Sequence, residues 1–147
     1  RNHRERAEQN YASHPHTKYR YSFLHSLHDY FTPARGNYVS RRGNLQPLGQ
    51  FKTRSRDTSN PIIPIKQSVR RIELEGAKRN TRIIAAYAEL RNGRVIKLHD
   101  LEGYLPQGQH RSAVFSHSRH VEKLILWVES TGRKRAYVNV NYRSARA

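Results

Sequence analysis

The stretch Val121-Glu-Lys-Leu-Ile-Leu-Trp-Val-Glu129 carries apolar side chains at both its even and its odd positions. Successive side chains of a strand point to opposite faces, so this pattern predicts a central strand with both faces buried. The following Ala136–Tyr142 alternates apolar and polar residues, which is typical of a strand with one buried face. Between them, Ser130–Lys134 contains Gly132 and basic side chains. We therefore expect a hairpin in which residues 130–134 are the turn.

Shorter strands are expected on the N-terminal side of this hairpin. Apolar residues and bounding turn residues place them at Gln46–Thr53, Val69–Leu74, Arg82–Leu90, Val95–Leu98 and Ser112–Phe115. The segment Arg91-Asn92-Gly93-Arg94 joins two of them, and Asn-Gly favours the two positive φ angles of a type I′ turn. Pro61 and Pro64 restrict Ile62-Ile63 to an edge strand or an extended crossing. The pattern predicts a mainly β fold, a single antiparallel β-sandwich of about seven or eight strands.

Residues 1–44 are a separate part in this prediction, a basic extension before a sandwich domain at 45–147. Apolar side chains recur in the extension at helical spacing and are the candidate partner-docking residues: Phe23, Leu27 and Phe31. They predict a short amphipathic helix over residues 22–31. A helix of this length is not stable alone, so we expect its apolar face to dock on a partner or on the domain. Deleting residues 1–44 is expected to leave the sandwich almost unchanged.

The charge of the chain limits its partners. The 147 residues include 28 Lys and Arg against 11 Asp and Glu, a net charge of +17. A surface of this sign attracts polyanions. The candidate polyanion-binding residues lie in clusters along the chain: Arg41, Arg42, Lys52, Arg54, Arg56, Arg70, Arg71, Lys78, Arg79, Arg82, Arg133, Lys134 and Arg135. Nucleic acid, lipopolysaccharide and an acidic protein or glycan are all compatible with these clusters.

The sequence contains no pattern typical of a catalytic or metal site. Cys is absent, which excludes disulfides and thiolate metal ligands. Nine His are present, but pairs such as His25 and His28 lack the third and fourth ligands that a metal site needs. Asp100 and Glu102 are more typical of a solvated strand end than of a catalytic pair. Trp127, on a strand with two apolar faces, favours core packing over a sugar-binding platform. We expect no enzymatic activity, no cofactor and no metal.

The order of several motifs resembles a known family. They are Leu48-Gly49, Arg56-Asp57 before Ile62-Ile63, Val69–Leu74, Asn92-Gly93, Leu105–Arg111 around Gly108, and Ser118–Leu124. Over about residues 45–144 the chain resembles the small secreted bacterial proteins of unknown function grouped as DUF2541. The resemblance implies an exported β-sandwich and carries over no functional residue. The paired cysteines of some members are absent here, and residues 1–44 have no counterpart.

Two functional hypotheses follow. The first is a non-enzymatic exported β-sandwich, secreted or periplasmic, whose basic arm contacts an anionic surface or a neighbouring subunit of an assembly. The chain starts at Arg1 instead of Met, which a removed signal peptide would explain. The alternative is an intracellular nucleic-acid-binding or nucleoprotein structural protein. No apolar run approaches the roughly 20 residues of a membrane-spanning helix.

Overall fold

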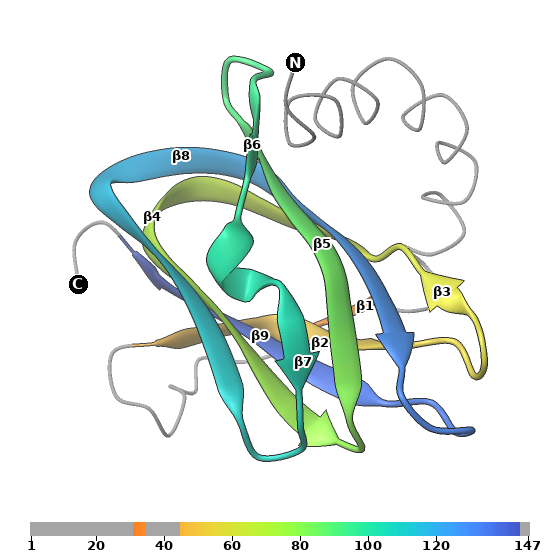
Figure 1. Ribbon diagram of the computed structural model, residues 1–147. Coiled ribbons are helices and arrows are strands. Elements are labelled where there is room, and N and C mark those ends of the chain that lie inside the picture. Colours follow the sequence, from red (N-terminus) through yellow and green to blue (C-terminus); the bar gives the residue numbers. More distant parts are fainter. Residues whose placement is uncertain (1–30, 35–44, 145–147) are drawn as a thin grey trace.

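The computed structural model describes residues 31–34 and 45–144, and in these ranges it confirms the predicted antiparallel β-sandwich (Figure 1). Nine strands are present in the described ranges: β1 (Phe31–Pro33), β2 (Gln46–Lys52), β3 (Thr58–Ser59), β4 (Ile62–Lys78), β5 (Thr81–Leu90), β6 (Val95–Lys97), β7 (Gly103–Leu105), β8 (His110–Ser130) and β9 (Tyr137–Ser144). A single 3₁₀ turn, η1 (His99–Leu101), links β6 and β7. Of the helix predicted over residues 22–31, all but Phe31 lies outside the described residues. None of the described segments is a helix long and apolar enough to cross a membrane.

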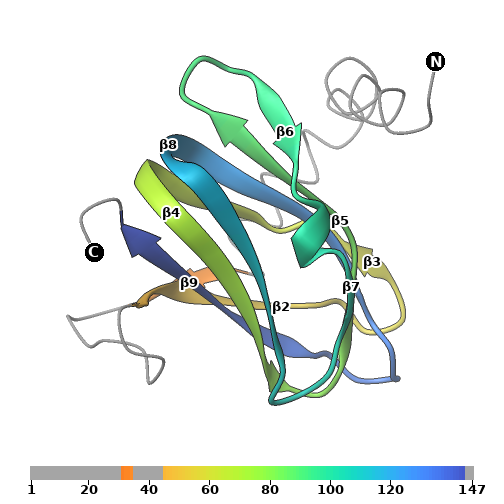
Figure 2. The ribbon, with the colours of Figure 1, turned by 60° about the vertical axis from the view of Figure 1, so that its left-hand side comes forward.

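The strands form one continuous antiparallel sheet that folds over on itself. Its order is β1-β2-β9-β4-β8-β5-β6, with β3 added beside β8 and β7 beside β5. The strands β4 and β8 are 17 and 21 residues long, and both curve from one layer into the other (Figure 2). The bend in β4 coincides with breaks in its register and with Lys66, whose φ of 54° is in the left-handed region. The two long strands thereby belong to both layers.

The core lies between the two layers. From β8 it receives Leu124, Leu126 and Val128, each with no exposed surface, and from β9 Val138 and Val140. On the other face of β8, Ile125 and the half-buried Trp127 pack in a second cluster. The Trp127 ring meets the Tyr87 ring edge-on, with centroids 5.8 Å apart. The prediction that this strand buries both faces is therefore confirmed.

The hairpin predicted between residues 121–129 and 136–142 is wrong. The strands β8 and β9 do not pair, because β4 lies between them. Leu124 of β8 is paired with Ile63 on one side and Ala88 on the other, so both edges of β8 are occupied. Residues 131–136 instead carry the chain past β4 to its far edge.

The hairpin of β5 and β6 is confirmed, but its turn is not of type I′. The Gly93 N–H donates to the Leu90 carbonyl oxygen (2.9 Å), and the Leu90 N–H donates to the Arg94 carbonyl oxygen (2.7 Å). Gly93 has a φ of 86°, whereas Asn92 does not have the positive φ that type I′ requires. The loop is thus a type I turn closed by a left-handed glycine, the usual three-residue hairpin connection.

The sheet also contains a strand that precedes Leu45, where the sandwich was predicted to start. In β1, Phe31 is paired with Phe51 of β2. Its side chain belongs to the core and is only 7% exposed. The assignment of Phe31 to an external partner is therefore corrected, because its ring packs inside its own sandwich. A Cβ at Gly49 would collide with the Thr32 carbonyl oxygen and the Phe31 ring, so glycine is what lets β1 approach β2.

Candidate functional site

Three connections meet at one end of the sandwich (Figure 1). The first connection follows β2, the second joins β4 to β5, and the third joins β8 to β9. Backbone hydrogen bonds hold them together, from the Thr53 N–H to the Ala136 carbonyl oxygen (2.9 Å) and from the Thr131 N–H to the Asn80 carbonyl oxygen (3.2 Å). We call this region the basic end, after the nine cationic residues that it collects: Lys52, Arg54, Arg56, Lys78, Arg79, Arg82, Arg133, Lys134 and Arg135.

Arg79 fixes the position of two of these connections. Arg79 lies in the tight turn after β4, where its backbone adopts a left-handed φ of 60°. Its backbone N–H donates to the Gln107 side-chain oxygen (2.8 Å). The Arg79 guanidinium donates to the Arg135 carbonyl oxygen (2.8 Å), which ties the β4–β5 turn to the β8–β9 loop. The loop is therefore attached by a side chain as well as by its backbone. Its cationic residues are held beside those of the turn.

Two lysines lie on either side of a tyrosine at the edge of the basic end. Lys52 of β2 and Lys78 of β4 are the register partners of Tyr137 in β9. The Lys78 ammonium is 5.8 Å from the centroid of the Tyr137 ring, a cation–π distance. One cation of the basic end therefore already contacts this ring.

Few carboxylates offset this charge. Within the same segments, Asp57 lies 3.8 Å from Arg54, and Glu129 is the register partner of Arg82. The Arg54–Asp57 pair is exposed, and such pairs contribute little. Six of the nine cationic residues are exposed: Arg56, Lys78, Arg82, Arg133, Lys134 and Arg135. Like charges held close together favour binding of a polyanion, which removes their mutual repulsion.

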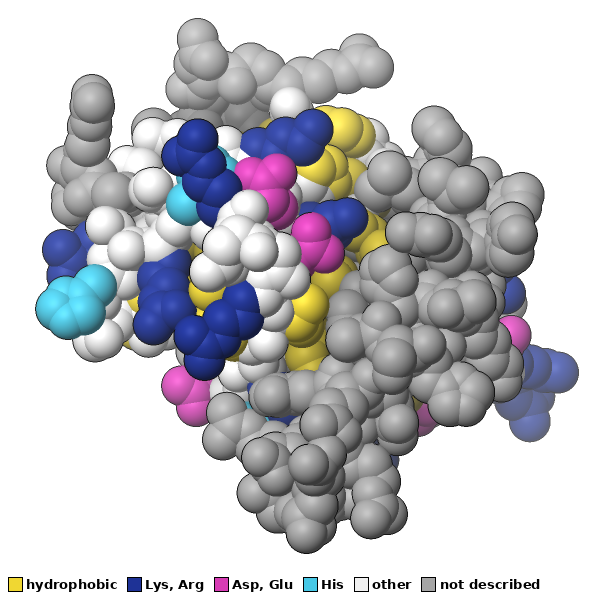
Figure 3. All heavy atoms as spheres, turned by 90° about the horizontal axis from the view of Figure 1, so that it is seen from above, with side chains coloured by type: hydrophobic (Ala, Val, Ile, Leu, Met, Phe, Trp, Pro, Cys, Tyr) yellow, Lys and Arg dark blue, Asp and Glu magenta, His cyan; other side chains and the backbone are white. Residues whose placement is uncertain are grey.

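The opposite end of the sandwich has a different distribution of charge. Figure 3 views that end and shows Lys and Arg side chains interspersed with Asp, Glu and His. His120 contacts Glu122 at 2.6 Å, and Lys123 lies 3.9 Å from Glu89. Some of the cations at that end are thus paired with a nearby carboxylate.

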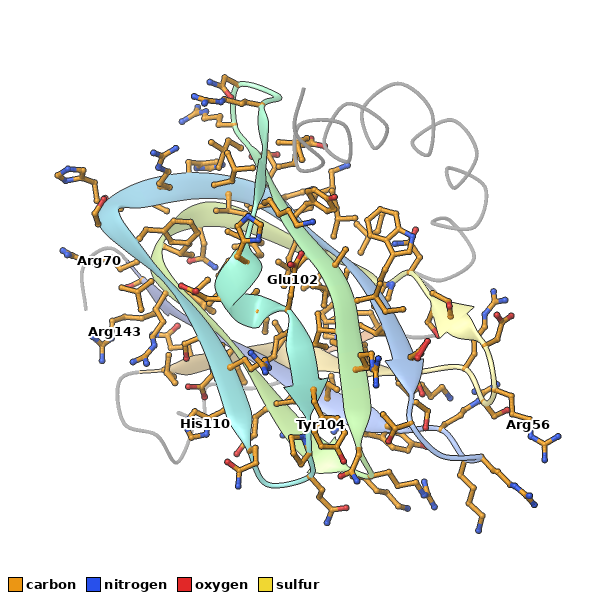
Figure 4. The ribbon with its side chains drawn as sticks, in the orientation of Figure 1. Arg56, Arg70, Glu102, Tyr104, His110 and Arg143 are labelled. Carbon is orange, nitrogen blue, oxygen red and sulfur yellow. The ribbon has the colours of Figure 1, made fainter. Side chains whose placement is uncertain are left out.

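The remaining predicted residues lie elsewhere. Arg70 and Arg71 are in the bend of β4, far from Arg56, as the labelled Arg70 shows (Figure 4). Arg71 is opposite Arg143 of β9, and the buried Nε atoms of both have no hydrogen-bond partner among the described residues. Sequence reasoning missed Arg143, because only the β4–β9 register brings it beside Arg71. Arg41, Arg42, Phe23 and Leu27 lie outside the described residues.

The acidic pair considered as a catalytic candidate has a structural role. Glu102 accepts a hydrogen bond from the Ala86 backbone N–H (3.1 Å) and lies 3.5 Å from both Lys97 and His99. It thus attaches the β6–β7 connection to β5 (Figure 4). Asp100 is exposed to solvent. Within residues 31–34 and 45–144, no three His, Asp or Glu side chains are grouped closely enough to hold a metal ion.

Comparisons with known proteins place the chain in no family. No protein-family model and no curated sequence matches it, so the DUF2541 resemblance stays a prediction. A Bacteroides ovatus protein provisionally assigned as an alpha-L-fucosidase is 18% identical over 76% of this chain, with a TM-score of 0.40, and the chain spans 18% of its length. The Drosophila melanogaster CENP-C cupin domain is 9% identical (76% of this chain, 73% of that one, TM-score 0.38). The CpGH89CBM32-4 protein produced by Clostridium perfringens is 14% identical (74% and 93%, TM-score 0.45). At these values none of the three bears on function.

Proposed function

We propose that this protein is a non-enzymatic binding protein that contacts a polymer of repeated phosphate or sulfate groups through the basic end. One observation carries the proposal: three connections, held together by hydrogen bonds, gather nine cationic residues and two carboxylates at one end of the sandwich. A polyanion bound there replaces the repulsion among these cations by attraction, and it releases counterions.

The geometry favours recognition of charge without recognition of bases. Stacking on an aromatic ring is how single-stranded nucleic acids are usually held. Tyr137, at the edge of the basic end, is half-buried, and the Lys78 ammonium lies over its ring. The Arg79 guanidinium donates a hydrogen bond to the Arg135 carbonyl oxygen, so Arg79 acts mainly as a positioning residue. We therefore expect binding that depends strongly on salt and weakly on base sequence.

The arm and the cellular location belong to the same proposal. Arg41 and Arg42 would add to the electrostatic contact, and Phe23 and Leu27 would add an apolar contact that salt does not screen. An exported protein requires a signal peptide, so the gene should encode a positively charged segment and an apolar segment upstream of Arg1. A start codon immediately before Arg1 would instead favour the intracellular nucleoprotein alternative.

The test measures affinity as a function of salt. Labelled single-stranded DNA, a heparin oligosaccharide and polyphosphate are titrated with the full chain between 50 and 500 mM NaCl. The R133Q/K134Q/R135Q variant removes three exposed cations from the β8–β9 loop. For the DNA probe, the slope of log K against log salt should become less steep by about 2, because each single-strand phosphate contact contributes about 0.7.

The matched control also removes three cations, but at the opposite end. The variant R91Q/R94Q/R119Q has the same net charge as the loop variant, and all three residues are exposed. Its slope should change much less, because these residues do not touch the polymer. Equal effects of the two triple variants would show that only net charge matters and would refute the basic end as the site. Preference among the probes distinguishes phosphate polymers from sulfated glycans.

A further inference from the structure

A cavity of about 600 Å³ opens on the outer face of the layer formed by β1, β2, β9 and β4. This volume is within the range of about 300–1,000 Å³ that is usual for small-molecule sites. The strands β2, β9 and β4 are neighbours in the sheet (Figure 2). Residues of all three strands line the cavity. The described residues that line it are Thr32, Pro33, Ala34, Pro47, Gly49, Gln50, Glu75, Gly76, Ala77, Asn139 and Asn141.

The floor of the cavity is a row of polar side chains across three strands. Along β9 these side chains alternate with the core residues Val138 and Val140, so they point away from the core. The Gln50 amide donates to the Asn139 side-chain oxygen (2.8 Å), and the Asn139 amide donates to Glu75 (3.4 Å). The chain thus fixes the orientation of two amides and one carboxylate toward the same opening.

Asn141 is the second observation that points to a ligand. It lines the cavity and is only 4% exposed. Its side-chain amide makes no hydrogen bond within the described part of the chain, and its N and O atoms are not among the described side-chain atoms that are fully buried without a partner, so they are accessible. A ligand in the cavity would give this amide its partner.

The hydrogen-bonding groups that remain free select the kind of ligand. Gln50 and Asn139 each keep one N–H, and Asn141 offers two, whereas acceptors remain on Gln50, Asn141 and Glu75. An anion would face the Glu75 carboxylate, and no Lys or Arg is among the described lining residues. A cation would leave the amide N–H groups without acceptors. Hydroxyl groups both donate and accept, so they fit this mixture.

We propose that this cavity is a saccharide-binding site, in which the amides of Gln50, Asn139 and Asn141 and the carboxylate of Glu75 bind ring hydroxyls. The β1 residues Thr32–Ala34 form one wall, and Pro47 and Ala77 supply apolar surface for the carbon face of a ring. The site is distinct from the basic end, because its described lining contains none of the nine cationic residues. The saccharide proposal therefore does not depend on the proposed binding of a polyanion at the basic end.

The test uses the full chain on an array of hexose, N-acetylhexosamine, deoxyhexose and hexuronate oligosaccharides. The best sugar is then titrated into solution by calorimetry. Asn141→Ala and Gln50→Ala should each weaken binding at least about tenfold, because each removes one or two hydrogen bonds to the sugar. Gln67→Ala is the matched control: this half-buried amide of β4 is not among the residues that line the cavity, and its loss should leave binding unchanged.

Thermal unfolding of each variant separates loss of the ligand from loss of the fold. Glu75→Gln provides a second readout, since it keeps the shape of the side chain and removes the negative charge. The affinity of this variant for neutral sugars should stay within a fewfold of the unmodified chain, and its affinity for hexuronates should rise. The proposal is overturned if no oligosaccharide binds the folded chain, if Asn141→Ala and Gln67→Ala behave alike, or if an arginine-rich peptide occupies the cavity in preference to every sugar. The polyphosphate titration is unaffected by these variants in either case.

Discussion

Leu126→Ala is the sharpest test of the fold, because this side chain is fully buried in the main core and lies in the C-terminal half of β8, the longest described strand. Its register partner on β5 is Ala86, whose small side chain cannot fill the space that a shortened residue would leave. Removing three carbons costs about 0.8 kcal/mol for each one, to which the cavity adds a further penalty. We expect a loss of roughly 3–5 kcal/mol in the free energy of unfolding.

Guanidinium unfolding followed by Trp127 fluorescence measures this loss, since Trp127 is adjacent in sequence and is the single tryptophan of the chain. Ile84→Ala is the control. Ile84 is on the neighbouring strand β5 but is 45% exposed, so its truncation should cost less than about 1 kcal/mol. A loss below 1 kcal/mol for Leu126→Ala, or equal losses for both variants, would refute the placement of Leu126 between the layers.

Three further substitutions test individual features. Phe31→Ala should cost about 3 kcal/mol at every protein concentration, because the ring packs in its own core; a cost that varies with concentration in equilibrium unfolding would return Phe31 to a partner interface. Gly93→Ala should cost about 1–2 kcal/mol, since its φ is 86°, whereas Gly132→Ala, in open space with no positive φ, should not destabilise; equal melting temperatures would contradict the turn geometry. Glu102→Ala should cost roughly 1–3 kcal/mol by removing the acceptor of the Ala86 N–H, and unchanged hydrogen exchange at that amide would contradict this role.

The local elements of the fold could be predicted from the sequence, but their pairing could not. Alternation of apolar residues located β2, β5 and the C-terminal half of β8, and the Asn-Gly pair located the β5–β6 connection. Alternation cannot say which strands are neighbours. The predicted β8–β9 hairpin failed because the six residues between the two strands also suffice to pass β4. Nor does the pattern show that strands as long as β4 continue through Gly76 and around a bend.

For the candidate sites too, the residues could be found in the sequence but their arrangement in space could not. Clusters of basic residues were visible in the sequence, but their assembly at one end depends on long-range contacts such as Arg79 with Arg135. The β4 cluster at Arg70 and Arg71 looked equivalent and lies apart from it. The cavity could not be predicted, because Gln50, Glu75 and Asn139 lie far apart in the chain and become neighbours only through the register of three strands. In isolation, each is an ordinary polar residue on a strand with one polar face.

The position of β9 has a consequence for how the protein folds during synthesis. It is the last described strand to emerge from the ribosome, yet it is inserted between β2 and β4. Until residues 137–144 are available, the facing edges of β2 and β4 have no partner, and one layer cannot close. Contacts such as Gln46 with Tyr142 join distant parts of the chain, and contacts of this kind slow folding. The nascent protein therefore stays incomplete, with open strand edges, until almost all of the described chain has been made.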